Sequence, residues 1–154
     1  MQQNYKDLFP ELPDHSRVWI YTSNRVFTPL ESGEISKEVD SFVSSWKAHQ
    51  TRLSAAGTIL LNRCLVFAVD EQTEAISGCS IDSSVKFVKS IGQQLDIDFF
   101  NRLNMLIIKD EEPTMISFHE LEMYKDSHVF NPNVDTLKNM RTKWLIPISE
   151  SPFI

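Results

Sequence analysis

The sequence has few cysteines and no long apolar run, and each shortage excludes a class of protein. Only two of the 154 residues are cysteine, which argues against a disulfide framework and fits a reducing compartment such as the cytoplasm. The longest apolar run, from Leu65 to Val69, is far too short to cross a bilayer. The first sixteen residues lack the apolar core of a signal peptide. We therefore expect a cytoplasmic protein that does not insert into membranes.

Glycine is also scarce, and the four that occur exclude a P-loop. Such a loop needs G-x-x-x-x-G-K-[ST], in which backbone N–H groups and the lysine meet the phosphates. No glycine here is followed by lysine. Two strings nevertheless imitate a transporter ATPase: LVFAVDEQT at 65–73 resembles its Asp-Glu strand, and ISGCS at 76–80 resembles its signature motif. Their order along the chain is the reverse of that in the ATPases, so we do not expect ATP hydrolysis.

The charge balance argues against nucleic acid as a partner. Fifteen basic residues stand against 21 acidic ones, which gives a formal net charge of −6 at pH 7. A phosphate backbone is bound by clustered lysine and arginine, and an acidic chain offers no broad face of that kind. The 42% hydrophobic and 23% charged fractions are those of a soluble globular protein.

Local patterns divide the chain into a lead-in and one domain. Residues 1–16, with Pro10 and Pro13, predict an extended lead-in that lies across the core through Phe9 and Leu12. Residues 17–154 predict a single domain of ordinary size. Within it we expect strands at 17–22, 75–76, 103–109 and 114–116, and either one bent strand or a hairpin over 57–70. We expect helices at 28–49, 81–95 and 135–144, and a short one opening with a capping box at 117–120.

This order of elements predicts an α+β fold. We expect a mostly antiparallel sheet with two main helices on one face, followed by short C-terminal helices. The first six elements, β-α-β-β-α-β, are ferredoxin-like in order. The alternative is a three-layer mixed sheet, which requires residues 17–22 and 64–70 to pair in parallel.

Four strings carry a resemblance to a known family. They are RVWIY at 17–21 with Ser23-Asn24-Arg25, Trp46 with His49, Val69-Asp70-Glu71, and SGCSIDSSV at 77–85. From about residue 17 to Trp144, the chain resembles a small family of uncharacterised Bacteroidota proteins that often carries the loose label "ABC transporter ATPase". The resemblance implies membership and no established activity. The phosphate loop that the label requires is missing, and the SESPFI ending departs from the usual ending of the family.

The SGCSIDSSV string predicts the start of a helix, with two possible roles. Ser80 or Asp82 can cap the helix by accepting a hydrogen bond from a nearby N–H group. The free N–H groups of the first turn can instead hold an anion or a polar ligand, and Arg25 can pair bidentately with its phosphate or carboxylate. The candidate ligand-binding residues are Ser23, Asn24, Arg25, Ser77, Gly78, Ser80, Asp82 and Ser83.

Two enzymatic alternatives stay open. Cys79 is a candidate nucleophile if the helix end stabilises its thiolate and a histidine acts as base; the candidates are His15, His49, His119 and His128. Asp70, Glu71 and Asp82, together with Glu74, are candidate magnesium ligands. Asp70 and Asp82 can share a metal if 71–80 is an open loop, and cannot if 64–70 and 75–79 form a hairpin.

The leading prediction is a binding or interaction module that is not an ATPase. We expect it to take a small anionic ligand or a protein partner and to need no cofactor or metal. The alternative is an enzyme that uses Cys79, or a metal at Asp70 and Asp82.

Overall fold

Strand β5 (Cys64–Asp70) is the central strand of a three-stranded sheet of long strands, which we call the larger sheet, in the computed structural model. The structure describes residues 4–48, 50–72 and 74–154. Strand β5 pairs antiparallel with β1 (Arg17–Thr22) on one side and with β4 (Ser54–Leu60) on the other. All six residues from Cys64 to Val69 are fully buried. A strand that is apolar on both faces requires a covering layer on each face.

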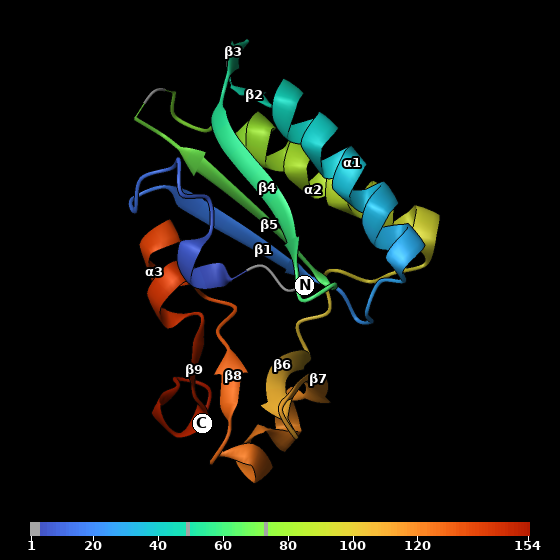
Figure 1. Cartoon of the computed structure of the whole chain (residues 1–154), viewed down its shortest axis with the longest axis vertical. Coiled ribbons are helices and arrows are strands. Elements are labelled where there is room, and N and C mark those ends of the chain that lie inside the picture. The colour runs from blue at the N-terminus through green and yellow to red at the C-terminus, as the bar shows by residue number, and fades with distance from the viewer. Residues whose placement is uncertain (1–3, 49, 73) are drawn as a thin grey trace.

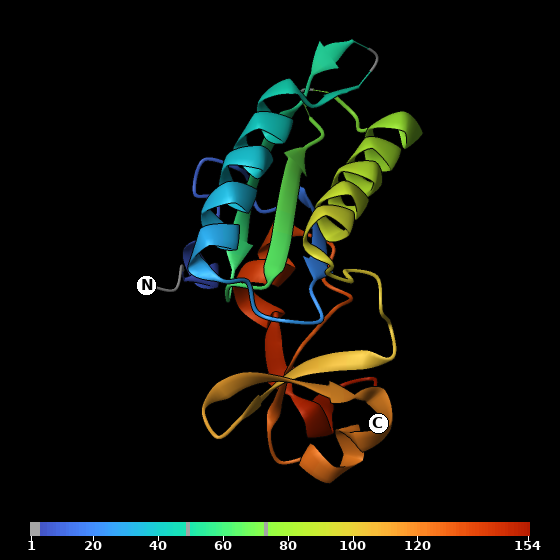
Figure 2. The same cartoon turned by 90° about the vertical axis from the view of Figure 1, so that its right-hand side faces the viewer.

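Two long helices cover one face of this sheet, as the sequence predicted. They are α1 (Pro29–Ser45) and α2 (Gly78–Leu95), which lie side by side in Figure 2. Alternate residues of β5, namely Leu65, Phe67 and Val69, pack into the cluster that these helices share. This arrangement follows from the two-residue period of a strand, which sends every second side chain to the same face.

The lead-in and helix α3 (Leu137–Lys143) cover the other face (Figure 1). The lead-in contains the short 3₁₀ helix η1 (Tyr5–Asp7) and buries Phe9, which is 6% exposed, while Leu12 is partly buried against the same cluster. Arg141 of α3 holds it in place: its guanidinium donates to the carbonyl oxygens of Leu8 and Phe9, both at 2.7 Å. The lead-in therefore packs against the core through Phe9 and Leu12 as expected, but its described residues form a 3₁₀ helix and turns and not an extended segment.

A second antiparallel sheet forms the lower part of the molecule in Figure 1. Its strand order is β7-β6-β8-β9, and the bounds are β6 Asn104–Lys109, β7 Glu112–Ser117, β8 His128–Phe130 and β9 Leu145–Pro147. The remaining elements are the hairpin of β2 (Lys47–Ala48) and β3 (Thr51–Arg52) and the 3₁₀ helices η2 (Phe118–Tyr124) and η3 (Ile148–Glu150). The chain is thus a single α+β domain with antiparallel sheets.

The ferredoxin-like arrangement is not confirmed, because its sixth element lies elsewhere. The three strands of the larger sheet have the order β1-β5-β4, and a ferredoxin-like sheet would add β6 beside β1. Instead β6 pairs with β7 and β8, while the outer edge of β1 is bridged at Arg17 by Thr136. The mixed three-layer alternative is wrong, because β1 and β5 are antiparallel.

Several element boundaries differ from the predicted ones. Residues 57–70 belong to a hairpin, with a turn at Leu61 and Asn62, and no strand forms at 75–76. Helix α2 begins at Gly78, three residues before Ile81.

The capping box at Thr28 and Glu31 is confirmed. The one expected at Ser117 is not, because Ser117 accepts instead from the N–H of His119.

Gly57 offers a direct test of the packing of α1 on β4. A Cβ atom built at this position would lie 2.9 Å from methyl groups of both Val39 and Val43 of α1. Gly57→Ala should therefore lower the free energy of unfolding by about 1–3 kcal/mol in chemical denaturation.

Gly33 provides the matched control, because a Cβ there meets nothing within 4 Å. Gly33→Ala should raise the free energy of unfolding by about 0.5–1 kcal/mol, as expected for an open helix position. Equal effects of the two substitutions would contradict the packing described above.

Candidate functional site

Hydrogen bonds at the start of α2 connect this helix to the residues that follow α1. Ser77, rather than Ser80 or Asp82, is the N-cap, and its hydroxyl accepts from the N–H of Ser80 at 3.1 Å. Ser80 is 1% exposed; its hydroxyl donates to the carbonyl of Lys47, and its own carbonyl accepts from the indole N–H of Trp46 at 2.9 Å. These bonds attach α2 to the residues that follow α1. The motif does begin a capped helix, but the predicted capping residues are wrong: the cap lies three residues before Ser80 and five before Asp82.

The remaining residues of this motif divide between the surface and the core. Gly78, Asp82 and Ser83 are exposed, and the hydroxyl of Ser83 donates to the carbonyl of Cys79 at 2.9 Å. Ser84 is buried and lies 3.3 Å from the hydroxyl of Tyr21 on β1. Burial raises the pKa of the Tyr21 phenol, and the hydrogen bond to Ser84 opposes that rise.

Ser23, Asn24 and Arg25 lie at the opposite end of α2. The Nη2 atom of Arg25 donates to the carbonyl of Leu95, the last residue of the helix, at 2.9 Å. Asn24 exchanges two hydrogen bonds with the backbone of Asp98, each 3.0 Å long. Because an 18-residue helix is roughly 27 Å long, the structure does not bring these residues together with Ser77–Ser83.

The guanidinium of Arg25 is already bound within the chain. Both of its terminal nitrogens donate to the carboxylate of Glu31 at 2.8 Å. That carboxylate also accepts from the backbone N–H of Thr28. The bonds from Arg25, and then the one from Thr28, lower the pKa of Glu31 from its usual 4.5 to about 2. The sequence showed Glu31 as part of a capping box, but only the fold shows it as the partner of Arg25.

The acidic residues proposed as magnesium ligands are separated. The predicted hairpin of 64–70 with 75–79 is wrong, and the open loop is shorter than 71–80, because residues 78–80 already belong to α2; Thr73 lies outside the described residues. Asp70 accepts from the N–H of Gln72, Glu71 pairs with Arg17 at 3.2 Å, and Asp82 is exposed on α2. Within residues 4–48, 50–72 and 74–154, no group of three or more His, Cys, Asp or Glu side chains could hold a metal ion.

The two cysteines differ in access. Cys79 is exposed on the first turn of α2, whereas Cys64 is fully buried in β5. Burial raises the pKa of the Cys64 thiol from 9.0 to about 11. The nearest candidate base by sequence, His49, lies outside the described residues, and His15, His119 and His128 are exposed. The assignment of Cys79 as a nucleophile stays a prediction.

A cleft of about 470 Å³ lies along the outer edge of β4. In Figure 1, β4 forms one edge of the larger sheet with α1 beside it. The cleft is lined by the lead-in, by the C-terminal half of α1 and by the middle of β4; the residues are Phe9, Pro10, Glu11, Asp40, Val43, Ser44, Ala56, Gly57 and Thr58. This volume falls within the range of small-molecule and cofactor sites. The sequence contained one signal for this cleft, namely Gly57 inside a strand. A glycine in a strand often marks a place where a ligand or another part of the backbone approaches closely.

Comparisons with protein-family models, with curated proteins and with solved structures found no match to this chain. The resemblance to the Bacteroidota family stays a prediction. No helix in the described part of the chain is both long enough and apolar enough to cross a bilayer.

The pair of Arg25 and Glu31 predicts a dependence of stability on pH. The folded state lowers the pKa of Glu31 to about 2, so its contribution is present above about pH 4.5 and is lost as the pH falls toward 2. The difference in unfolding free energy between the wild type and Glu31→Gln should therefore shrink over that range. In an Arg25→Met background most of this pH dependence should vanish, because Arg25 is its largest cause; an unchanged dependence would contradict the pairing.

The cysteines predict selective alkylation. At neutral pH, iodoacetamide should modify Cys79 alone in the native protein, because Cys64 is buried and its pKa is raised. Intact-mass measurement should show one adduct for the wild type and for Cys64→Ser, none for Cys79→Ser, and two for the denatured wild type. Rapid labelling of native Cys79→Ser would contradict the burial of Cys64.

Proposed function

We propose that the protein is a binding module that takes an extended, cationic peptide segment in the cleft along β4. The observation that carries the proposal is the composition of this cleft, which combines two carboxylates with the edge of a sheet. Lysine and arginine are absent from its described lining, so nothing there neutralises those carboxylates.

The charges of the cleft favour a basic ligand. Glu11 and Asp40 are both exposed and come from the lead-in and from α1, on two different walls of the cleft. The chain as a whole carries a formal charge of −6, which adds a long-range attraction for cations. Complementary charge of this kind increases the association rate and discriminates among partners.

The strand edge favours an extended ligand. Among the described residues, β5 is the only strand paired with β4, and residues Ala56–Thr58 of β4 line the cleft. A strand at the edge of a sheet can accept a peptide as an additional strand, and main-chain hydrogen bonds then supply much of the affinity. Phe9 and Val43 add apolar walls on either side of that edge.

The hydrogen bonds inside the cleft favour binding over catalysis. The hydroxyl of Ser44 donates to the carbonyl of Asp40 at 2.7 Å, within α1, so it is held by its own helix. A serine nucleophile would instead need a base within hydrogen-bond reach. We do not place the ligand at the N-terminus of α2, because Ser77 caps that end and Arg25 lies at the other.

The proposal predicts binding of a basic extended probe. A ten-residue peptide of alternating lysine and threonine should bind in isothermal titration calorimetry, and amide chemical shifts of Ala56–Thr58 should change in NMR spectra. The double variant Glu11→Gln, Asp40→Asn should bind about tenfold more weakly, which corresponds to about 1.4 kcal/mol, because the charges facing the lysines are removed.

Matched controls separate this site from general attraction to an acidic protein. The double variant Glu120→Gln, Glu122→Gln changes net charge equally on the exposed surface of η2 and should bind like the wild type. A peptide of alternating glutamate and threonine, and a backbone N-methylated lysine peptide, should not bind. Equal weakening by both double variants, or undiminished binding of the N-methylated peptide, would overturn the proposal.

A further inference from the structure

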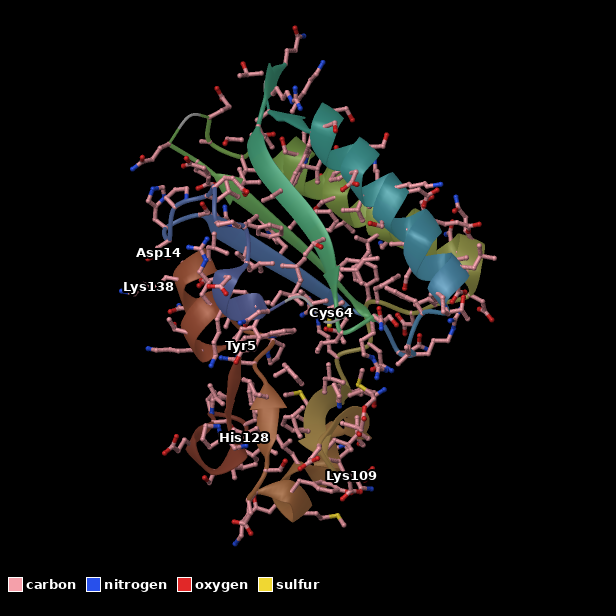
Figure 3. The ribbon with its side chains drawn as sticks, in the orientation of Figure 1. Tyr5, Asp14, Cys64, Lys109, His128 and Lys138 are labelled. Atoms are coloured by element: carbon pink, nitrogen blue, oxygen red, sulfur yellow. The ribbon has the colours of Figure 1, made fainter. Side chains whose placement is uncertain are left out.

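Arg63 is a charged residue buried at the turn between β4 and β5. It is 5% exposed and is the last of the three turn residues that join β4 to β5; the two before it, Leu61 and Asn62, have φ angles of 57° and 54°. Arginine is almost never fully buried unless it is paired. The next residue, Cys64, lies at the junction of the upper and lower parts of the molecule in Figure 3.

The guanidinium of Arg63 has almost no partners in the described chain. Its Nε atom is buried without a hydrogen bond, and its Nη2 atom reaches only the carbonyl of Ser23, at 3.5 Å. No carboxylate among the described residues forms an ion pair with it. Desolvation by burial is the main influence on its pKa, which is lowered, yet a guanidinium remains charged in proteins.

The surrounding backbone holds this cation in place. The N–H of Ser23 donates to the carbonyl of Arg63 at 2.8 Å, and the N–H of Phe27 donates to the carbonyl of Asn62 at 2.7 Å. These bonds tie the loop at 23–27 to the hairpin turn. The two acidic residues that bond to the loop at 23–27 have other partners for their carboxylates: Glu31 binds Arg25, and Asp98 accepts from the N–H of Phe100.

We propose that Arg63 is the receptor for an oxyanion, a phosphate or carboxylate group, that binds to its guanidinium at the hairpin turn. A guanidinium presents parallel N–H donors that match two oxygens of such a group. An anion at this place would provide the hydrogen bonds that Nε lacks and the counter-charge that a buried cation requires. Arg63 does not line the cleft along β4, so this site is separate from the proposed peptide site.

The test compares anions at constant ionic strength. For an affinity in the millimolar range, 20 mM phosphate or acetate should raise the Tm of the wild type by about 4 °C relative to chloride. A response to phosphate alone identifies a phosphate-bearing ligand, and a response to acetate as well identifies a general carboxylate or phosphate site. A wild-type Tm that is the same in all three salts overturns the proposal.

Variants identify the residue responsible. Arg63→Met should lose the anion response and keep or raise its Tm in chloride, because an uncompensated buried charge has been removed. Arg52→Met, at an exposed arginine of β3, should respond like the wild type. An anion response retained in Arg63→Met overturns the assignment.

A direct measurement covers the case in which Arg63→Met does not fold. The Nε–Hε signal of Arg63 in ¹⁵N-labelled wild type should shift and saturate on titration with phosphate, and that of Arg52 should move little. Saturable shifts at other arginines, with that of Arg63 unchanged, overturn the proposal.

Discussion

The complete burial of β5 is the constraint on which the rest of the structure depends. Six consecutive residues of this strand contact no solvent, and their side chains alternate between two apolar clusters. Burial of that surface is the main driving force for folding, and it requires cover on both sides. Helices α1 and α2 cover one side. The lead-in, α3 and residues of the second sheet cover the other, which explains why the lead-in is anchored by Arg141 through several carbonyl groups.

Helix α2 is held at both ends by hydrogen bonds to other parts of the chain. Many polar residues of the sequence motifs take part in these bonds. At its start, Ser80 and Trp46 join it to the residues after α1. At its end, Arg25 binds the final carbonyl while paired with Glu31, the residue that also completes the cap of α1. One ion pair therefore connects the beginning of α1 with the end of α2. Residue types that suit an anion site are used here to orient two helices.

The two proposed sites lie at two features of this fold: the edge strand of the larger sheet and a buried arginine in a turn. Strand β4 is an edge of the larger sheet, and its outer side carries acidic groups from elements on both faces. Arg63 is carried into the interior by the tight turn that joins β4 to β5. The carboxylates beside β4 are exposed, whereas the guanidinium of Arg63 is buried without an ion-pair partner among the described residues. Burial of such a charge is costly for folding, and a bound anion would reduce that cost.

The sequence alone determined the local features, because these depend on neighbours a few residues apart. It predicted the cap at Thr28, the amphipathic helices and the antiparallel α+β class, each of which the structure confirms in outline. It did not predict that β6 leaves the larger sheet, that Arg25 meets Glu31 and the end of α2, or that Arg63 is buried without a counter-charge. The place of β6, the partners of Arg25 and the burial of Arg63 depend on contacts between segments that are far apart in the sequence. Local spacing of residue types does not determine such contacts, so only the tertiary structure shows them.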